Sequence, residues 1–79
     1  MALSDLPLAS GLQHAKVFQK CFGWIVRRVG NHITLTHPGF SRVTLSIPNH
    51  KEVKRPLLHT QIAKAGRTDE EYRDAFDSL

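Results

Sequence analysis

Two histidines stand where an imidazole could act on a bound molecule. His32 directly follows a Gly-Asn pair at the start of an alternating apolar and polar run, and His50 lies in a basic segment with Lys51, Lys54 and Arg55. An imidazole titrates near neutral pH and serves as a base or an acid, while Lys and Arg stabilise charge that develops on a phosphate. Cleavage of RNA by its own 2′-hydroxyl needs these groups and no metal. Plain phosphate binding and an ordinary surface position are the alternatives for both histidines.

The remaining histidines and the single cysteine have simpler interpretations. We expect His14 on the solvent side of a helix, His37 in a turn, and His59 early in a helix, facing solvent or RNA. Cys21 is expected to be a small core residue and not a nucleophile. One cysteine allows neither an intrachain disulfide nor a Cys-rich zinc site, and no two histidines have the i, i+4 spacing of helical zinc ligands. We therefore expect no metal site and no cofactor.

Positive charge is concentrated in the first 68 of the 79 residues. Residues 1–68 hold ten Lys or Arg against two acids, whereas residues 69–79 hold five acids against one Arg. A basic body of this kind attracts polyanions, and nucleic acid is the first candidate. A basic surface that serves only solubility is the alternative. The acidic end is expected to be the solvated face of a helix, and the alternative is that it folds over the basic body.

The length of the chain predicts a single small domain. Residues 1–11 have no basic segment before a long apolar run, so we expect no signal peptide. No apolar run approaches the roughly 20 residues that span a bilayer, so no membrane association is expected. A single thiol suits a reducing compartment, and we expect a cytoplasmic protein.

Helical periodicity and capping signals predict three helices. They are expected over residues 11–22, 56–65 and 68–79. Ser10 and Gln13 have the spacing of a capping box before the first helix, and Gly23 suits its left-handed end. Thr68 and Glu71 repeat the capping-box spacing before the third helix, which is acidic.

Alternation of apolar and polar residues predicts three antiparallel strands between the first two helices. They are expected over residues 24–28, 32–36 and 42–47. Pro38 and Gly39 suit the centre of a type II turn. One face of this sheet is apolar, and the opposite face carries His32, Thr34, Thr36, Arg42, Thr44 and Ser46. We expect a two-layer α+β sandwich of α-β-β-β-α order, in which the first two helices cover the apolar face.

This order of signals resembles the HicA (YcfA-like) family of bacterial toxins. The resemblance covers roughly residues 6–67. It rests on the runs FGWIVRRVGNHITLTHPG, RVTLSIP, NHKEVK and LLHTQIAKAG, which hold a Gly-Asn-His turn, a His-Pro turn and a basic segment that begins at a histidine.

The resemblance implies a double-stranded-RNA-binding-domain-like fold and the activity of an mRNA interferase, an endoribonuclease. It places the catalytic histidine at His32, with His50 as a further candidate, and implies neutralisation by a HicB-type antitoxin. Phosphates of the RNA would be held by Arg27, Arg28, Arg42, Lys51, Lys54 and Arg55. The chain then divides into an N-terminal tail (1–9), a HicA-like nuclease domain (10–67) and a short acidic helix (68–79).

Two alternatives to a ribonuclease stay open. One is a non-catalytic RNA-binding module that uses the same surface, and the other is a protein-interaction domain whose basic face docks an acidic partner. Loss of cleavage with retained RNA binding, on substitution of His32, separates the ribonuclease from the binding module. The interaction domain predicts no salt-sensitive affinity for RNA.

Overall fold

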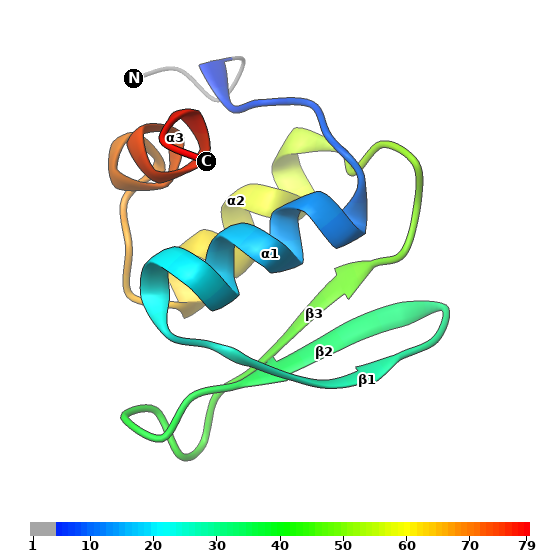
Figure 1. The fold of residues 1–79 in the computed structure, drawn as a ribbon, viewed down its shortest axis with the longest axis vertical. Helices are drawn as coiled ribbons and strands as arrows, with labels where there is room; N and C mark the ends of the chain where they lie inside the picture. The colour runs from blue at the N-terminus through cyan, green and yellow to red at the C-terminus, as the bar shows by residue number, and fades with distance from the viewer. Residues whose placement is uncertain (1–4) are drawn as a thin grey trace.

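A three-stranded antiparallel sheet packs beneath two helices in the computed structural model of this protein, which describes residues 5–79 (Figure 1). The elements are α1 (Gly11–Phe22), β1 (Ile25–Val29), β2 (His32–Thr36), β3 (Thr44–Pro48), α2 (Arg55–Lys64) and α3 (Asp69–Asp77). The strands are ordered β1-β2-β3, α1 and α2 cover one face, and α3 packs on both helices away from the sheet. The expected α+β architecture is confirmed. Residues 1–4, which begin the predicted tail and the segment searched for a signal peptide, lie outside the described residues.

The first helix, α1, has the ends that the sequence predicts. The Ser10 hydroxyl accepts a hydrogen bond from the Gln13 backbone N–H, and the Gln13 side chain accepts one from the Ser10 N–H. Gly23 ends the helix with a φ of 78°, where a side chain would be strained. Gly11 is required for a different reason, because a Cβ there would lie 2.2 Å from the Pro48 carbonyl oxygen. The first turn of α1 therefore packs directly on the end of β3.

Local signals also account for α2 and α3. Pro56 lies in the first turn of α2, where its missing N–H removes no helical hydrogen bond. Gly66, with a φ of 74°, reverses the chain after α2. Thr68 and Glu71 form the predicted capping box at the start of α3. Within the described part of the chain, no helix is long and apolar enough to cross a membrane.

The strands follow the predicted alternation, with differences at their ends. β1 starts one residue later than predicted, and β3 starts at Thr44 because the chain turns again after Phe40. The Phe40 N–H donates to the His37 carbonyl and closes the turn at Pro38-Gly39. The prediction of a type II turn is wrong, because Gly39 does not have the positive φ that this turn requires. Its N–H instead donates to the His37 ring at 2.9 Å, much as in an Asx turn.

His14 is buried, so the prediction of a surface position is wrong. It is 0% exposed, its Nδ1 lies 2.6 Å from the Tyr72 hydroxyl oxygen, and the centroid of the Phe76 ring is 5.8 Å from that of the imidazole. The side of α1 that carries His14 faces α3, and such tertiary cover is not visible in the periodicity of α1 alone. Burial of the phenol also raises the pKa of Tyr72.

Cys21 lies at the surface, so the prediction of a core position is also wrong. Its Sγ lies 3.8 Å from the Ala75 carbonyl oxygen, at the margin of the contact between α1 and α3. The buried residue on this part of α1 is Phe18, which is 0% exposed, and Phe22 packs against it while partly buried. The end of α1 is thus held by aromatic rings and not by the thiol.

Lowering the pH should destabilise the fold through His14. Burial lowers the pKa of His14 from its usual 6.5 to about 4. Between these values the unfolded chain binds more protons than the folded protein, so the free energy of unfolding falls as the pH drops through this window. The difference corresponds to about 3 kcal/mol, measurable by urea unfolding at about pH 7 and about pH 4.

A pair of variants isolates the contribution of His14. His14→Gln should flatten the pH dependence of the unfolding free energy, whereas His32→Ala, at an exposed histidine, should leave it unchanged. Equal pH dependence in His14→Gln and in the parent protein would contradict the assignment to His14.

Candidate active site

The ladder between β2 and β3 decides which side chains leave the core. Its inner residues are all 0% exposed beneath the helices, and they are Ile33, Leu35, Leu45 and Ile47. The residues that alternate with them point to the opposite face, and these are His32, Thr34, Thr36, Thr44 and Ser46. We call this surface the open face, because all three helices lie on the other side of the sheet (Figure 1).

A β-bulge in β1 adds two arginines to the open face. The register of β1 against β2 shifts at Arg27, the extra residue, so that Arg28 pairs with Thr34. In a regular ladder Arg28 would stand opposite Ile33 on the buried face. Instead both arginines face outward, and the Arg27 Nε donates to the Thr36 Oγ1 at 2.8 Å. Because of the bulge, neither of these two consecutive charged residues faces the core.

His32 and Arg28 line one shallow hollow at the end of the open face. The hollow has a volume of about 260 Å³ and is lined by Arg28, Gly30, Asn31, His32 and Thr34. His32 is exposed, so its ring is accessible to a molecule bound there. An imidazole, a guanidinium, an amide and a hydroxyl border the same space, and this set of donors and acceptors suits a phosphodiester with its neighbouring 2′-hydroxyl.

The turn before His32 is held from the end of β3 by Asn49. The Asn49 Nδ2 donates to the Gly30 carbonyl at 2.9 Å, and the Asn49 backbone N–H donates to the Asn31 carbonyl at 3.0 Å. Within the turn, the Gly30 N–H donates to the His32 carbonyl at 3.1 Å. The sequence pattern assigns no role to Asn49. In the sequence, the one indication of a role for Asn49 is that it directly follows the strand that pairs with the strand of His32.

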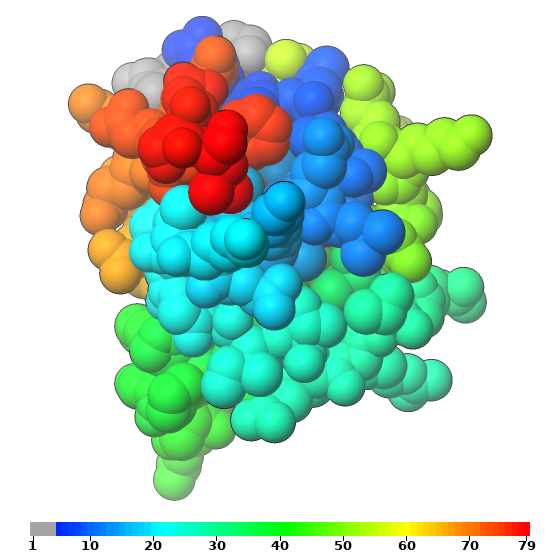
Figure 2. Space-filling model, in the orientation of Figure 1, coloured from blue at the N-terminus to red at the C-terminus, as the bar shows by residue number. Residues whose placement is uncertain are grey.

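His50 follows Asn49, but the described lining of the hollow does not include it. His50 is exposed, and its carbonyl accepts a hydrogen bond from the Gly11 N–H at 2.9 Å. The connection from β3 to α2 lies beside the β1–β2 turn at one end of the molecule (Figures 1 and 2). The structure thus brings the backbone of His50 near the turn that precedes His32.

The predicted phosphate-binding cations fall into separate groups. Lys51 and Lys54 are exposed in the same connection as His50. Arg55 is half-buried, and its Nε donates to the Leu6 carbonyl at 2.8 Å, so it ties the N-terminal segment to α2. Arg42 is exposed in the β2–β3 connection, which lies at the opposite end of the sheet (Figures 1 and 2).

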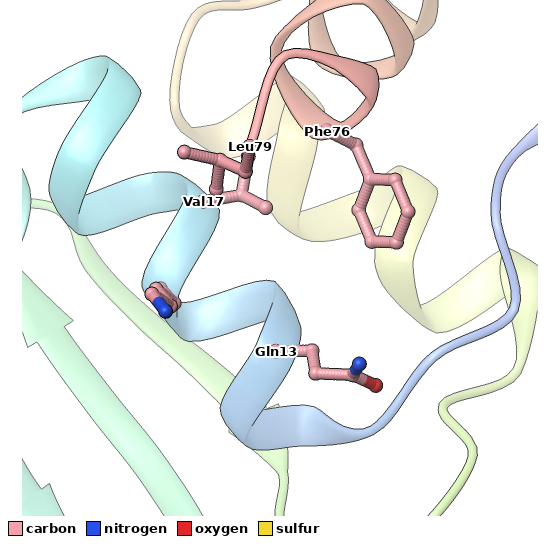
Figure 3. A pocket seen from close by; sticks show the side chains of 5 residues that line it. Gln13, Val17, Phe76 and Leu79 are labelled. Atoms are coloured by element: carbon pink, nitrogen blue, oxygen red, sulfur yellow. The ribbon is translucent and has the colours of Figure 1, made fainter.

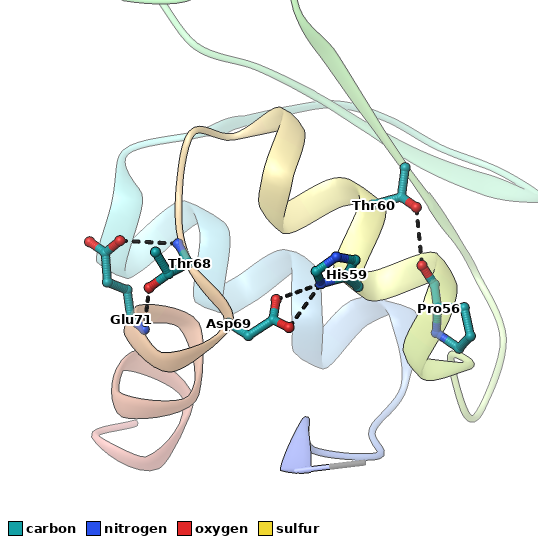
Figure 4. A network of polar contacts seen from close by, with 6 residues as sticks. All are labelled: Pro56, His59, Thr60, Thr68, Asp69 and Glu71. Atoms are coloured by element: carbon teal, nitrogen blue, oxygen red, sulfur yellow. Dashed lines mark hydrogen bonds and ion pairs between the residues drawn. The ribbon is translucent and has the colours of Figure 1, made fainter. Parts of the chain in front are cut away.

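The two remaining histidines make structural contacts. The His37 ring packs against Trp24 and Phe40, each at a centroid distance of 5.2 Å, which agrees with its predicted place in the turn. The His59 Nδ1 lies 2.8 Å from both carboxylate oxygens of Asp69 and joins α2 to α3 (Figure 4). The side chain of His59 is still 53% exposed, so it faces solvent on the helical side of the molecule.

The acidic helix α3 also stays on the helical side. The Glu71 carboxylate accepts a hydrogen bond from the Thr68 backbone N–H (Figure 4), which lowers its pKa, and it also pairs with Arg67. Asp77 pairs with Arg73 one turn away. α3 lies across α1 and α2 from the sheet (Figure 1), so it packs on two helices of the basic body and does not cover the open face.

Two other hollows lie on the helical side of the molecule. Figure 3 shows the first, between α1 and α3, with a volume of about 310 Å³ and a lining of Gln13, Lys16, Val17, Phe76 and Leu79. The second, of about 370 Å³, is lined by His59, Arg67, Thr68, Asp69 and Glu70. Its histidine is already paired with a carboxylate, and two acids make it less suited to a phosphate. Across residues 5–79, no group of three or more His, Cys, Asp or Glu could hold a metal ion.

Comparison with known protein families adds independent information. A family model described as the HicA toxin of bacterial toxin–antitoxin systems matches residues 13–66, more than half of the chain. The chain belongs to the HicA toxin family. The matched region of this HicA toxin runs from the first turn of α1 through the sheet and α2, and it ends before α3. No curated protein and no solved structure matches the chain significantly.

Family membership confirms the resemblance seen in the sequence. It makes the protein the toxin of a toxin–antitoxin pair, and an antitoxin is therefore its partner. The matched residues include His32, Arg28 and Asn49, so the hollow and the bonds that hold its turn lie inside the family region.

Deleting Arg27 from this HicA toxin should remove the bulge and keep the fold. The remaining arginine would still stand opposite Thr34, so the free energy of unfolding should change by less than about 1 kcal/mol. Deleting Val26 is the matched control, because it places an arginine opposite the fully buried Leu35 and should destabilise the sheet strongly. Thermal unfolding compares the two deletions. Equal destabilisation would show that the bulge itself is needed for the sheet.

Proposed function

We propose that this HicA toxin is an endoribonuclease that cleaves mRNA, with His32 as general acid or general base. The proposal rests on one observation, which is that His32 and Arg28 line the same hollow on the open face. Cleavage of RNA by its 2′-hydroxyl demands proton transfer and stabilisation of negative charge, and these two side chains supply them. The resemblance of this sequence to the HicA family implies the activity of an mRNA interferase and supports the same reaction.

The proposed reaction is an internal transfer at phosphorus. The 2′-oxygen attacks the adjacent phosphorus as a base removes its proton, and the bond from phosphorus to the 5′-oxygen breaks as an acid protonates that oxygen. The products are a 2′,3′-cyclic phosphate and a 5′-hydroxyl. His32 performs one of the two proton transfers, and Arg28 stabilises the charge on the non-bridging oxygens. His50, whose backbone lies beside the same turn, is the candidate for the other transfer.

The cations around the hollow would hold the RNA backbone. Lys51 and Lys54 are exposed on one side of the turn, and Arg27 projects from the bulge along the open face. Arg42 lies in the β2–β3 connection, at the end of the sheet away from the hollow, so it would contact RNA only if the RNA strand crosses the whole sheet. Arg55 contributes mainly by holding the basic connection, since its Nε is bonded to the Leu6 carbonyl. Contacts of this kind read phosphates and 2′-hydroxyls with little dependence on sequence.

The partner of this surface would be an antitoxin of HicB type. A ribonuclease of this kind acts on mRNA in the cytoplasm, where the antitoxin must cover the hollow to silence it. Exposed Arg28, Lys51 and Lys54 favour a partner with an acidic contact surface, because opposite charge speeds and orients association.

Substitution of His32 tests the catalytic assignment. His32→Ala should lower the rate of RNA cleavage by roughly 10²–10⁴-fold, because the proton transfer is lost, while RNA binding and the fold persist. The assay incubates labelled RNA with purified protein in EDTA and identifies the 2′,3′-cyclic phosphate ends. His59→Ala is the control, because that histidine is bonded to Asp69 on the helical side and should retain full activity.

The other outcomes of this assay separate the alternatives. Cleavage by His32→Ala within a few-fold of the parent rate would refute the catalytic role of His32. Salt-sensitive RNA binding without cleavage by the parent protein would identify a non-catalytic RNA-binding module. Loss of parent activity in EDTA, restored by a divalent cation, would refute the metal-independent mechanism.

A further inference from the structure

We infer that Asn49 is a positioning residue that fixes the direction of the His32 side chain, an inference that rests on the proposed ribonuclease function. Asn49 stands directly after β3, opposite the turn that joins β1 to β2. Its side chain and its backbone donate to two successive carbonyls of that turn, at Gly30 (2.9 Å) and Asn31 (3.0 Å). His32 is the next residue along the chain.

The turn needs this support because its own geometry does not supply it. Val29 pairs with Ile33, so three residues, Gly30, Asn31 and His32, join the paired positions, and hairpin loops of three residues normally include one in the left-handed conformation. In residues 5–79 only Gly23 and Gly66 have a positive φ, so this connection lacks such a residue. Gly30 and Asn31 are exposed, and glycine has the widest conformational freedom of any residue. The bonds from Asn49 restrict that freedom.

The two accepting carbonyls belong to the peptide units that precede His32, so holding them fixes the orientation of the backbone at His32. The Asn31 carbonyl belongs to the peptide unit whose N–H is that of His32, and this unit is planar. Holding the Asn31 carbonyl therefore sets the plane from which the His32 Cα projects its side chain. The Gly30 carbonyl fixes the preceding plane in the same way, so the two bonds act on successive peptide units.

The same residue connects both histidine-bearing segments. His50 follows Asn49, and the His50 carbonyl accepts a hydrogen bond from the Gly11 N–H at the start of α1. A continuous set of bonds thus runs from α1 through His50 and Asn49 to the turn before His32. Small misplacement of a catalytic group costs roughly 10²-fold in rate, so rigidity along this path matters for proton transfer.

Asn49→Ala removes the side-chain bond to the Gly30 carbonyl and keeps the backbone bond to the Asn31 carbonyl, so it should lower kcat and leave KM almost unchanged. The described lining of the hollow does not include Asn49, so its removal should spare the contacts that the hollow itself makes with RNA. We expect kcat to fall roughly 10- to 100-fold and KM to stay within about twofold. Asn49→Asp keeps the shape and the backbone bond but loses the side-chain donor when ionised, and its kcat should fall as well.

Gln61→Ala provides a matched structural control. The Gln61 Oε1 accepts a hydrogen bond from the Ser46 N–H at 2.9 Å, a side-chain bond to the same strand away from the turn. Its loss should lower the melting temperature about as much as Asn49→Ala does, while kcat stays at the parent value. Equal kcat in Asn49→Ala and Gln61→Ala would overturn the positioning role.

Amide hydrogen exchange tests the turn without any use of RNA. The Gly30 N–H, bonded to the His32 carbonyl, should exchange faster in Asn49→Ala and at the parent rate in Gln61→Ala. Unchanged exchange in Asn49→Ala would overturn the inference whatever the RNA assay shows. Faster exchange in a protein whose parent does not cleave RNA would instead refute the ribonuclease function and leave Asn49 as the residue that holds the turn.

Discussion

The burial of one face of the β2–β3 ladder is the constraint on which the rest of the structure depends. Ile33, Leu35, Leu45 and Ile47 are fully enclosed by α1 and α2. A slip of one residue would expose these four and bury His32 with the threonines, so the register is strongly specified. The composition of the open face is therefore a consequence of the core. His32 faces solvent because Ile33, the next residue of β2, faces the core.

Both edges of the sheet have features that discourage pairing with a further strand. β1 is an edge strand with a bulge and two arginines, and bulges and charges both discourage pairing with a further strand. On β3, the Ser46 N–H is taken by the Gln61 side chain, and Pro48 has no N–H to offer. The bulge also carries Arg28 to the hollow. One irregularity thus protects the edge and completes the candidate site.

The sequence predicts the features that neighbouring residues decide, and it does not predict those that depend on packing between distant segments. The range of α1, both capping boxes, the span of β2 and the identity of its outward residues follow from spacing, because nearest neighbours decide them. His14 and Cys21 were misplaced because the packing of α3 on α1 decides their burial. The pair Arg27-Arg28 held a signal for the bulge, since a strand with one buried face cannot alternate through two arginines. Nothing local indicates that Asn49 reaches the turn before His32.

Two histidines of this small protein have different properties because one is buried and the other is exposed. His14 is enclosed by Tyr72 and Phe76, and its lowered pKa keeps it neutral as part of the packing between α1 and α3. His32 stands across the sheet from that layer, in contact with solvent and beside Arg28. The helical layer can therefore hold the fold without taking part in chemistry at the open face. An antitoxin that covers the open face would not need to displace α3, because the two surfaces lie on opposite sides of the molecule (Figure 1).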